Sequence, residues 1–456
     1  MKLKPNLRRW YSPGLGLKRW AVLGGVSIAM VIIGLWSMVN NQYAKDIVVG
    51  FVNFLQRSIP DLSVGQGLVC AVFGGVVAYL SITLFRKQYQ TITQGSTGQS
   101  QFDAYYQDSL LASGPKIVVI GGGTGLSVLL KGLKHYTSNI TAAVSVGDDG
   151  GSSGRLRKEF GVVPVGDIRA CIVALADEED VMEKVFNYRF SRGEGLKGHS
   201  LGNLLLVALT NISGNFQDAV ANADQILHIN GRVLPITTEP LELCAELASG
   251  EYVRGECKIG ECEEQIEHMY IDPPYAEVLP QVLDAIAEAD AVILGPGSLY
   301  TSIMPNLCVH QVVDAIKESE CKTFYVCNVT QQPGETTGYT AADHLQAIYD
   351  HSCSEMIDYM IVDDGKTETK IPLADFLVQA SERVVVDHER LDSFNTEIIE
   401  TNVVCEDNPY RHDSMKLAQT IMKAIYNDKD YKLRYGLAKT WLDYRRFQKM
   451  KEGEEQ

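Results

Sequence analysis

The stretch Lys116–Gly125, Lys-Ile-Val-Val-Ile-Gly-Gly-Gly-Thr-Gly, constrains the fold of this chain more than any other stretch. Its β-branched residues, Ile117 to Ile120, predict a short strand that is buried on both faces, as in a parallel sheet. Glycines end this strand, and leucines at helical spacing follow. Glycine lets a ligand approach the backbone closely, and free amides at a helix N-terminus favour an anion such as phosphate. The stretch therefore predicts a strand–turn–helix unit that binds a nucleotide or another phosphate ligand, although a tight turn without a ligand is the alternative.

The size and charge of the chain exclude some classes of protein. With 456 residues it can form one large domain or two to three smaller ones. Its net charge of -16 argues against nonspecific binding of nucleic acid, which requires a basic face. The spacing of Cys257, Cys262 and His268 does not fit a zinc knuckle. We therefore expect ordinary thiols in a reducing cytosol and no nucleic-acid partner.

Two uncharged, largely apolar runs near the N-terminus have the length of membrane spans, at about 1.5 Å of helix per residue. We place these spans at residues 21–39 and 64–85, within a membrane hairpin formed by residues 1–90. Basic residues flank the outer ends of both runs, so the positive-inside rule predicts both ends in the cytoplasm. A cleaved signal peptide would explain the first run but not the second. The expected location is the cell membrane, multi-pass, with the main domain in the cytoplasm.

Beyond the hairpin, residues 91–112 are polar and of low complexity, which predicts a linker. Short apolar strands then alternate with helical stretches, which predicts an α/β fold. We expect a Rossmann-like, mostly parallel sheet within residues 113–430, with a helical cap at Gly166–Ile229 and a helical or disordered tail at 431–456. Further strands are expected at Ile140–Val146, Ala291–Leu294, Thr323–Val326, Met356–Val362 and Arg383–Val386.

Three more segments have weaker patterns. Arg254–Glu267 has charge and glycine but little periodicity, so it is interpreted as a surface excursion. Tyr410–Asn427 predicts an amphipathic closing helix. Lys449–Gln456 is highly charged and predicts disorder.

A glycine-rich loop, Gly147–Arg155, follows the second expected strand. In a doubly wound sheet the end of that strand lies beside the first loop. Asp148 and Asp149 can face one site from such a turn, which suits a hydrated Mg²⁺ shared with substrate phosphates. Ser152 and Ser153 add hydroxyl donors, and the arginine that ends the loop adds a planar cation for phosphate. The alternative is a loop whose aspartates and serines only close turns and cap a helix.

Two helix starts carry polar side chains that can contact a ligand. Asp167 and Arg169 stand at the first, where an N-cap and its surface partner explain them equally well. His199 and Asn203 stand at the second, where Ser200 as a simple N-cap explains half of the pattern without a ligand.

Two later loops, Leu294–Ser302 and Asn328–Thr336, also follow buried strands. Glycine turns at the carboxyl ends of sheet strands form one crevice, where open α/β sheets bind ligands. Here hydroxyl groups can donate to phosphate, and Tyr300 can stack on a base or bond a sugar, although a capped helix start is the plain alternative. The chain has no Ser-His-Asp order and no P-loop lysine, so covalent catalysis and P-loop ATP hydrolysis are not expected.

The candidate residues fall into two groups. Asp148 and Asp149 are the candidate metal ligands, and are catalytic only if the protein is an enzyme; Mg²⁺ is the one cofactor considered. The candidate ligand-binding residues are Gly121, Gly122, Gly123, Thr124, Gly125, Ser152, Ser153, Arg155, Asp167, Arg169, His199, Asn203, Gly297, Ser298, Tyr300, Thr301 and Asn328.

Six motifs, taken together and in this order, resemble those of one family. They are Ile120-Gly-Gly-Gly-Thr-Gly125, Asp148-Asp-Gly-Gly-Ser-Ser-Gly-Arg155, Gly166-Asp-Ile-Arg169, Gly198-His-Ser-Leu-Gly-Asn203, Gly295-Pro-Gly-Ser-Leu-Tyr-Thr-Ser302 and Gln332-Pro-Gly-Glu-Thr336. The chain resembles the 2-phospho-L-lactate transferase superfamily, and within it the branch of gluconeogenesis factors, over roughly Lys116–Asn427. The resemblance implies a Rossmann-like fold with a nucleotide site between these loops.

The resemblance implies two different activities. The transferases move a phospholactyl group from a nucleotide diphosphate carrier to a deazaflavin hydroxyl with Mg²⁺, so Asp148 or Asp149 would hold the metal or position the hydroxyl. The gluconeogenesis factors are similar in fold but are regulators that bind UDP-sugars such as UDP-N-acetylglucosamine, and they support cell shape and wall synthesis on gluconeogenic carbon. The versions of the last two motifs favour this second branch. The N-terminal hairpin departs from the soluble pattern of many relatives.

Three hypotheses follow. The first is a membrane-tethered UDP-sugar-binding regulator of morphogenesis, with cell-wall synthesis proteins and a second copy of the chain as candidate partners. The second is a Mg²⁺-dependent transferase that moves a phosphorylated group from a nucleotide diphosphate carrier to an acceptor hydroxyl. The third, a nicotinamide oxidoreductase, is disfavoured because Leu126 stands where the dinucleotide fingerprint requires a third glycine.

Overall fold

The computed structural model describes two compact units of the chain, Met1–Ser113 and Gly114–Gln456. The described residues are 24–29, 73–83, 108–176, 180–262, 264–353, 355–366 and 382–454. In the first unit, residues 24–29, 73–83 and 108–111 are helical. Among the described residues, no helix combines the length and the apolar character that a membrane span requires. Residues 21–23 and 30–39 of the first predicted span and residues 64–72 and 84–85 of the second lie outside the described residues, so the structure gives the predicted hairpin no support.

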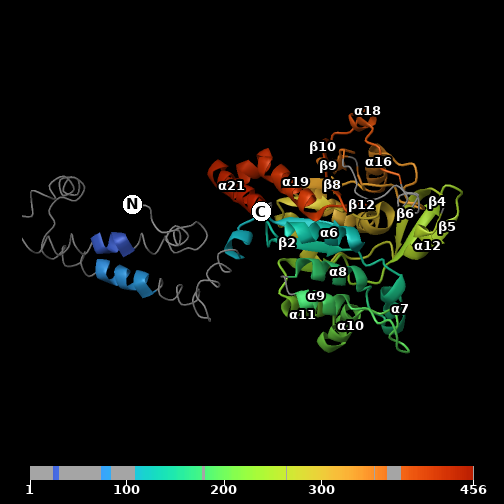
Figure 1. Ribbon diagram of the computed structural model, residues 1–456, viewed down its shortest axis with the longest axis horizontal. Coiled ribbons are helices and arrows are strands. Elements are labelled where there is room, and N and C mark those ends of the chain that lie inside the picture. Colours follow the sequence, from blue (N-terminus) through green and yellow to red (C-terminus); the bar gives the residue numbers. More distant parts are fainter. Residues whose placement is uncertain are drawn as a thin grey trace, which may run out of the picture. The chain divides into compact units, whose positions relative to one another are not determined.

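The second unit is built on a seven-stranded sheet in the order β10-β9-β8-β7-β1-β2-β3 (Figure 1). All neighbouring strands in it run parallel. The strands are β1 (Ile117–Gly121), β2 (Ile140–Val144), β3 (Arg232–Pro235), β7 (Ala291–Leu294), β8 (Lys322–Val326), β9 (Tyr359–Asp363) and β10 (Glu397–Thr401). The predicted α/β fold with a mostly parallel sheet is therefore confirmed.

Helices cover this sheet on both faces. They include α6 (Gly123–Leu133), α8 (Gly166–Leu175), α13 (Pro280–Glu288), α15 (His310–Glu318), α16 (Ala341–His351) and α19 (Ser414–Asn427). Among them, α6, α8 and α13 contact strands β1, β2 or β3 directly. The chain passes from β1 through α6 to β2 in one direction along the sheet, and from β7 through α15 to β8 in the other. Because such crossovers are right-handed, α6 and α15 lie on opposite faces.

The core is apolar on both sides of the central strands. Ile117 to Ile120 and Ala291 to Leu294 are fully buried, as the absence of a polar residue in either run predicts. Helix α6 buries its leucines and packs between α19 and α8. At Gly132 it lies so close to α19 that an added Cβ would be 2.0 Å from the carbonyl oxygen of Ser414. Glycine at this position allows the two helices to touch.

A group of helices follows β2 and lies below the sheet in Figure 1. Besides α8, its members are α7 (Gly151–Phe160), α9 (Asp180–Asn187), α10 (Leu201–Ser213) and α11 (Phe216–Leu227). The prediction of several consecutive helices within Gly166–Ile229 is confirmed. Gly161 and Gly214, both with positive φ, end α7 and α10 in the left-handed conformation that glycine favours.

A second, antiparallel sheet lies at the right of Figure 1. Its strands are β4 (Glu242–Leu247), β5 (Tyr252–Arg254) and β6 (Ile266–Asp272), with the short helix α12 (Glu256–Gly260) between the last two. The interpretation of Arg254–Glu267 as a surface excursion is wrong, because Ile259 and Ile266 anchor this segment in the core. The segment is short and changes from strand to helix to strand, so no single periodicity extends far enough to be recognised.

Two expectations for the last part of the sheet differ from the structure. Arg383–Val386 does not form a sheet strand; Arg383 makes only an isolated bridge with Thr330. The edge strand is β10, which follows the helical turn α18 (His388–Leu391). Its sequence, Glu-Ile-Ile-Glu-Thr, is half polar because one strand edge and part of its surface face outward.

The C-terminal segment contains more regular structure than expected. Asn408–His412 is strand β12, paired with β11 (Val404–Cys405), and helix α19 begins only at Ser414, because the Asp413 side chain accepts the N–H groups of Met415 and Lys416. Helices α20 (Lys429–Tyr435) and α21 (Leu437–Glu454) follow. The predicted disorder from Lys449 is therefore wrong up to Glu454. Phe447 is buried and its ring lies 5.3 Å from that of Tyr136.

Candidate functional site

The strand order creates a switch point between β1 and β7. From β1 the chain proceeds toward β2 and β3, and from β7 it proceeds toward β8, β9 and β10. The loops that leave these two adjacent strands diverge, and open α/β sheets bind ligands in the resulting crevice. The glycine turns predicted at Gly121–Gly125 and Gly295–Gly297 meet here, since a Cβ at Gly121 would lie 3.7 Å from the Cα of Gly295.

A cleft of about 210 Å³ lies at this switch point. Four segments form its walls: the start of α6, the loop after β7, the loop after β8, and β12. The lining residues are Thr124, Gly125, Val128, Pro296, Gly297, Ser298, Asn328, Val329, Thr330, Gln332, Tyr410, Arg411 and His412. Five of these were candidate ligand residues. Those of β12 were not, because that segment was expected to be part of a helix.

The start of α6 forms one wall with backbone donors. Its N-cap, Gly122, supplies no side-chain cap. Burial raises the pKa of Asp167, and contact with the backbone N–H of Gly123 opposes the increase, so the first amide of the helix already faces a carboxylate. The amides of Thr124 and Gly125, which line the cleft, can face an anion. Gly123 has a φ of 68°, which favours glycine. A Cβ at Gly125 would lie 2.5 Å from the carbonyl oxygen of Pro296. These glycines are therefore required by the turn and by the close approach of the two loops.

Gln332 connects the loops that follow β7 and β8. Its Nε2 donates to Oγ of Ser298 at 2.7 Å, and its Oε1 accepts from Nδ2 of Asn328 at 3.3 Å. The side-chain amide of Gln332 therefore holds both Ser298 and Asn328 in place at the cleft wall.

Glu335 holds the start of the π-helical turn η2 (Leu299–Ile303), which leads into α14 (Met304–Leu307). Its buried carboxylate accepts the hydroxyl of Thr301 at 3.0 Å and the N–H of Tyr300 at 3.3 Å. Burial raises the pKa of Glu335, and these donated hydrogen bonds oppose the increase. Thr301 thus uses its hydroxyl within the fold and does not line the cleft.

Tyr300 lies in the core and not in the cleft. Its side chain is 2% exposed, and its hydroxyl oxygen lies 2.8 Å from that of Tyr339. Its ring packs edge-on against Tyr339 and His351. Burial raises the pKa of Tyr300 well above its usual range. This environment leaves no free ring face for a base.

Three carboxyl groups from separate segments lie close together beside the β1 loop: Asp148 after β2, Asp167 at the start of α8, and Glu256 at the start of α12. Burial raises the pKa of Asp148. Burial first, and then the charge of Asp148, raise the pKa of Asp167 to about 6 and that of Glu256 to about 8. The cluster borders the crevice, because a Cβ at Gly122 would lie 2.8 Å from Oδ2 of Asp167.

Asp149 has a different environment from its neighbour Asp148. Its Oδ1 accepts the N–H of Cys257 at 3.0 Å, and a Cβ at Gly255 would lie 2.5 Å from its Oδ2. Asp149 therefore anchors the turn that carries α12. The two adjacent aspartates thus face different neighbours, which the glycine-rich sequence around them could not reveal.

Ser152 connects α7 to the start of α10. Its hydroxyl oxygen lies 2.9 Å from Nδ1 of His199 and accepts from Nδ2 of Asn203 at 3.1 Å. All three side chains are buried, and burial lowers the pKa of His199. The Ser200 side chain caps α10, as the structural alternative proposed. This network organises the helices beside the carboxyl cluster.

The remaining candidates lie around the same helices. Ser153 accepts the N–H of the first residue of α8 at 3.0 Å. Arg155 donates to the carbonyl oxygen of Lys197 at 3.0 Å. Arg169 donates to the side-chain oxygen of Asn187, while its own Nε is buried and has no partner. None of these residues lines the cleft of the switch point.

The carboxyl cluster can be tested against the chemistry of Mg²⁺. In the part of the chain that the structure describes, no three His, Cys, Asp or Glu side chains form a ready metal site. Mg²⁺ needs only one or two carboxylates, because water and substrate phosphates complete its shell. Asp148 and Glu256 fit that requirement, since a cation would relieve the repulsion between their charges. Asp149 fits less well because it already holds Cys257.

Sequence reasoning missed three residues of this region. Glu256 stands in a segment without a recognisable pattern, and only the antiparallel sheet brings it to Asp148. Arg411 stands in β12, where a helix was expected. Glu335 belongs to the motif Gln332-Pro-Gly-Glu-Thr336. The sequence of this loop does not indicate that its carboxylate accepts hydrogen bonds from Tyr300 and Thr301.

Comparison with known proteins agrees with this geometry. Residues 117–404 match the profile of a family described as 2-phospho-L-lactate transferase CofD. A protein from Nostoc sp. is 43% identical over 427 residues, 91% of this chain and 92% of its own. A protein from Bacillus subtilis named "Gluconeogenesis factor" is 44% identical over 312 residues, 68% of this chain and 98% of its own.

A crystal structure of a protein from Bacillus halodurans superposes with a TM-score of 0.65 at 42% identity, over 68% of this chain and 99% of that one. The matched regions contain the sheet and the glycine loops described above. The chain therefore belongs to the 2-phospho-L-lactate transferase CofD family, and within it is similar to proteins named gluconeogenesis factors.

Proposed function

We propose that this chain binds a UDP-sugar in the cleft between the β1 and β7 loops and acts as a regulator of growth and morphogenesis on gluconeogenic carbon. The observation that carries the proposal is the start of α6, where Gly122 supplies no side-chain cap and Thr124 and Gly125 line a cleft of about 210 Å³ at the switch point. Such a helix start favours the diphosphate of a nucleotide sugar. The name of the Bacillus subtilis relative supports the connection to gluconeogenesis.

The cleft offers complementary groups to such a ligand. Thr124 and Gly125 belong to the first turn of α6, where backbone donors meet the phosphates. Ser298 and Asn328 add side-chain donors whose positions Gln332 fixes. Arg411 lines the wall formed by β12 and adds a planar cation.

Calorimetric titration of the full-length chain with UDP-N-acetylglucosamine tests the proposal. We expect binding in the parent and, in Asn328→Ala, affinity weaker by about tenfold, which corresponds to the loss of one good polar contact. Ser393→Ala serves as the control, because this exposed serine bonds only the carbonyl oxygen of Arg390. No heat of binding in the parent at millimolar ligand would reject the UDP-sugar.

The carboxyl cluster favours a second candidate function, a Mg²⁺-dependent transferase. The family description names a transferase, and Asp148, Asp167 and Glu256 lie beside the same crevice. An acceptor hydroxyl would form a new P–O bond while the bond to the nucleotide breaks, and its proton would pass to a carboxylate with a pKa near neutral. Mg²⁺, held by Asp148 and Glu256, would neutralise phosphate charge. New signals in the phosphorus NMR spectrum of chain, carrier and acceptor would favour this candidate over pure binding.

We also propose that residues 21–39 and 64–85 anchor the chain in the membrane, with the CofD-like domain in the cytoplasm. The charge pattern at the ends of both runs supports this topology. A reporter enzyme fused after Gln456 should be active only in the cytoplasm, and one inserted near Phe51 only outside. Cytoplasmic activity at both positions would reject the hairpin.

A further inference from the structure

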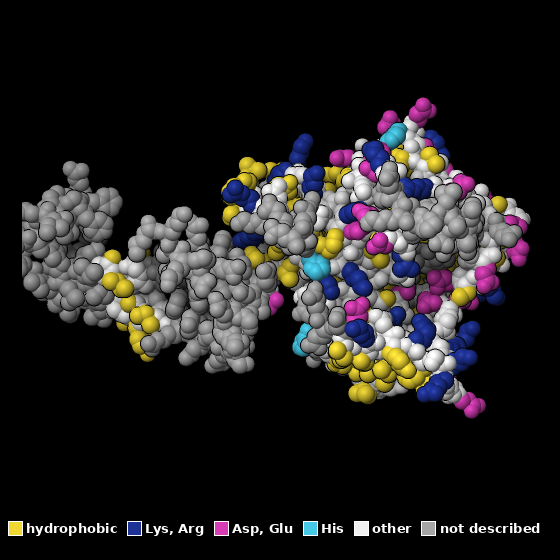
Figure 2. All heavy atoms as spheres, in the orientation of Figure 1, with side chains coloured by type: hydrophobic (Ala, Val, Ile, Leu, Met, Phe, Trp, Pro, Cys, Tyr) yellow, Lys and Arg dark blue, Asp and Glu magenta, His cyan; other side chains and the backbone are white. Residues whose placement is uncertain are grey.

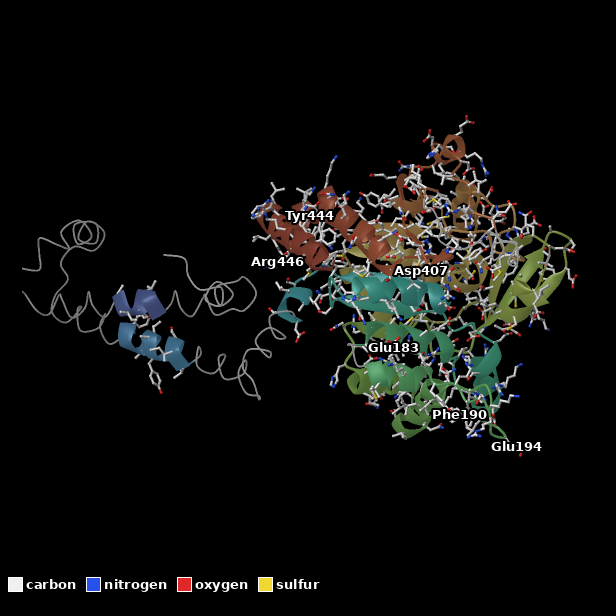
Figure 3. All side chains as sticks on the ribbon, in the orientation of Figure 1. Glu183, Phe190, Glu194, Asp407, Tyr444 and Arg446 are labelled. Atoms are coloured by element: carbon white, nitrogen blue, oxygen red, sulfur yellow. The ribbon has the colours of Figure 1, made fainter. Side chains whose placement is uncertain are left out.

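Three arginines from separate elements lie around one loop, and among the described residues none of them has a carboxylate within 4.0 Å. They are Arg155 in α7, Arg169 in α8, and Arg189 just after α9. The loop is the segment between α9 and α10, which contains Lys197 and Gly198. In Figure 2 Lys and Arg side chains gather at the lower right, on the side where Figure 3 labels Phe190 and Glu194 of this loop.

Contacts with the loop bring the guanidinium groups of Arg155 and Arg189 together. Arg155 donates from Nη2 to the carbonyl oxygen of Lys197 at 3.0 Å, and Arg189 donates from Nη1 to the carbonyl oxygen of Gly198 at 2.6 Å. These carbonyl groups belong to consecutive residues. A Cβ at Gly198 would lie 2.9 Å from Nη2 of Arg155, so the backbone passes directly beneath this side chain.

Arg169 forms the floor of the same region. Its stem packs against Gly202, where a Cβ would lie 2.8 Å from Cδ of Arg169, and its Nη1 donates to the side chain of Asn187. Its Nε is buried and has no hydrogen-bond partner among the described residues. Burial lowers the pKa of Arg169, and the charge of Arg189 lowers it further, so the two cations are near neighbours.

This arrangement concentrates positive charge beside one loop. Arg155 and Arg189 are exposed and Arg169 is partly buried. The nearby charge of Asp167 offsets part of the repulsion that Arg169 experiences from Arg189. Among the described residues, no carboxylate lies within 4.0 Å of the three groups, whereas some other arginines of this acidic chain form ion pairs. Arg254 pairs with Asp272 and Arg390 with Asp343, for example.

We propose that Arg155, Arg169 and Arg189 form an oxyanion-binding site, separate from the cleft at the switch point, that takes a phosphate or carboxylate group. Arg155 and Arg189 keep N–H donors beyond those that they give to carbonyl oxygens, and Arg169 adds positive charge beneath them. The buried network of Ser152 and His199 fixes the backbone that carries this loop. This proposal does not depend on which nucleotide binds in the cleft at the switch point.

Thermal unfolding of the full-length chain in rising inorganic phosphate, against chloride at matched ionic strength, tests this site. A ligand that binds only the folded chain raises Tm. We expect a phosphate-specific rise in the parent, and in Arg189→Gln a concentration dependence shifted about tenfold to higher phosphate. Arg189 is exposed, so this variant should fold. Arg169→Lys, which keeps the charge but loses the fork, should show an intermediate shift. Arg390→Gln removes an arginine that already has acidic partners and should respond like the parent.

The same titration distinguishes this site from the cleft. With Asn328→Ala the phosphate response should persist, because Asn328 lines only the cleft. A response that is lost in Asn328→Ala and kept in both arginine variants would place the anion in the cleft and overturn the proposal. A parent that shows no phosphate-specific rise at tens of millimolar would overturn it as well. Carrying out the same series with citrate shows whether carboxylates share the site.

Discussion

The hydroxyl oxygen of Ser152 lies 2.9 Å from Nδ1 of His199, although 47 positions separate them in the chain. The contact fastens α7, which follows the carboxylate-bearing loop, to α10, which ends the arginine-bearing loop. Two motifs that look independent in the sequence therefore form one buried polar network.

Replacing Ser152 by alanine should destabilise the fold. The substitution leaves the buried side chains of His199 and Asn203 without a shared partner, which costs about 1–3 kcal/mol. Urea unfolding of Ser152→Ala beside Ser393→Ala measures the difference. If both variants unfold at the same urea concentration, the network does not stabilise the domain.

Glu335→Ala should weaken ligand binding through the geometry of the β7 loop. The variant removes the acceptor of two hydrogen bonds at the start of η2, so Ser298 should lose its fixed position. We expect weaker binding by about tenfold, together with a lower Tm. Glu335→Gln keeps an acceptor oxygen and should restore most of the affinity. An equal loss of affinity in Glu335→Ala and Glu335→Gln would show that binding depends on the charge of Glu335 and not on the position of the β7 loop.

Acidification should stabilise the carboxyl cluster. Asp167 and Glu256 have ordinary pKa values of 3.8 and 4.5 and folded values of about 6 and about 8. The folded chain therefore binds more protons than the unfolded chain in this window. The stability from these groups is fully present below pH 3.8 and is lost as the pH rises through about 6 and then about 8.

Glu256→Gln should remove part of that dependence. At pH 8 we expect its Tm to exceed that of the parent by about 2 °C, and the difference should vanish near pH 5. Glu288→Gln is the contrasting control, because Lys116 lowers the pKa of Glu288. A parent whose Tm rises steadily from pH 5 to pH 8, with no effect of Glu256→Gln, would contradict the raised pKa values.

Gly125→Ala should damage the crevice directly. The new methyl group would lie 2.5 Å from the carbonyl oxygen of Pro296, and relieving this overlap should cost about 1–3 kcal/mol. Gly260→Ala adds the same group where no atom lies within 4 Å. Thermal unfolding of both variants compares the two sites, and an equal small effect would mean that the loops separate freely.

The fold was largely predictable because short, continuous stretches of sequence define most of its strands. Ile117–Gly121 and Ala291–Leu294 are continuous apolar runs between glycine turns, and these define a buried parallel strand wherever they occur. The edge strand β10 was missed because its sequence, Glu-Ile-Ile-Glu-Thr, lacks strict alternation and is as compatible with a surface helix as with a half-exposed strand.

The site was only partly predictable because it depends on contacts between distant segments. Thr124, Ser298 and Asn328 follow predicted strands, and the strand order brings them to one cleft. Tyr300 stands in an equally suggestive motif, yet its ring turns into the core against Tyr339. Glu256 reaches Asp148 only through a small sheet whose strands gave no readable period.

The close contact of Gly132 with Ser414 affects how tolerance to substitution should be read in this protein. Gly132 is on the face of α6 that meets α19 and not among the residues of the cleft. A systematic replacement library would nevertheless find it as intolerant as the glycines of the ligand loops. In this protein, a glycine that tolerates no substitution can therefore mark a close backbone contact as well as a ligand site. Ligand-binding residues must be identified by assays that measure ligand binding directly.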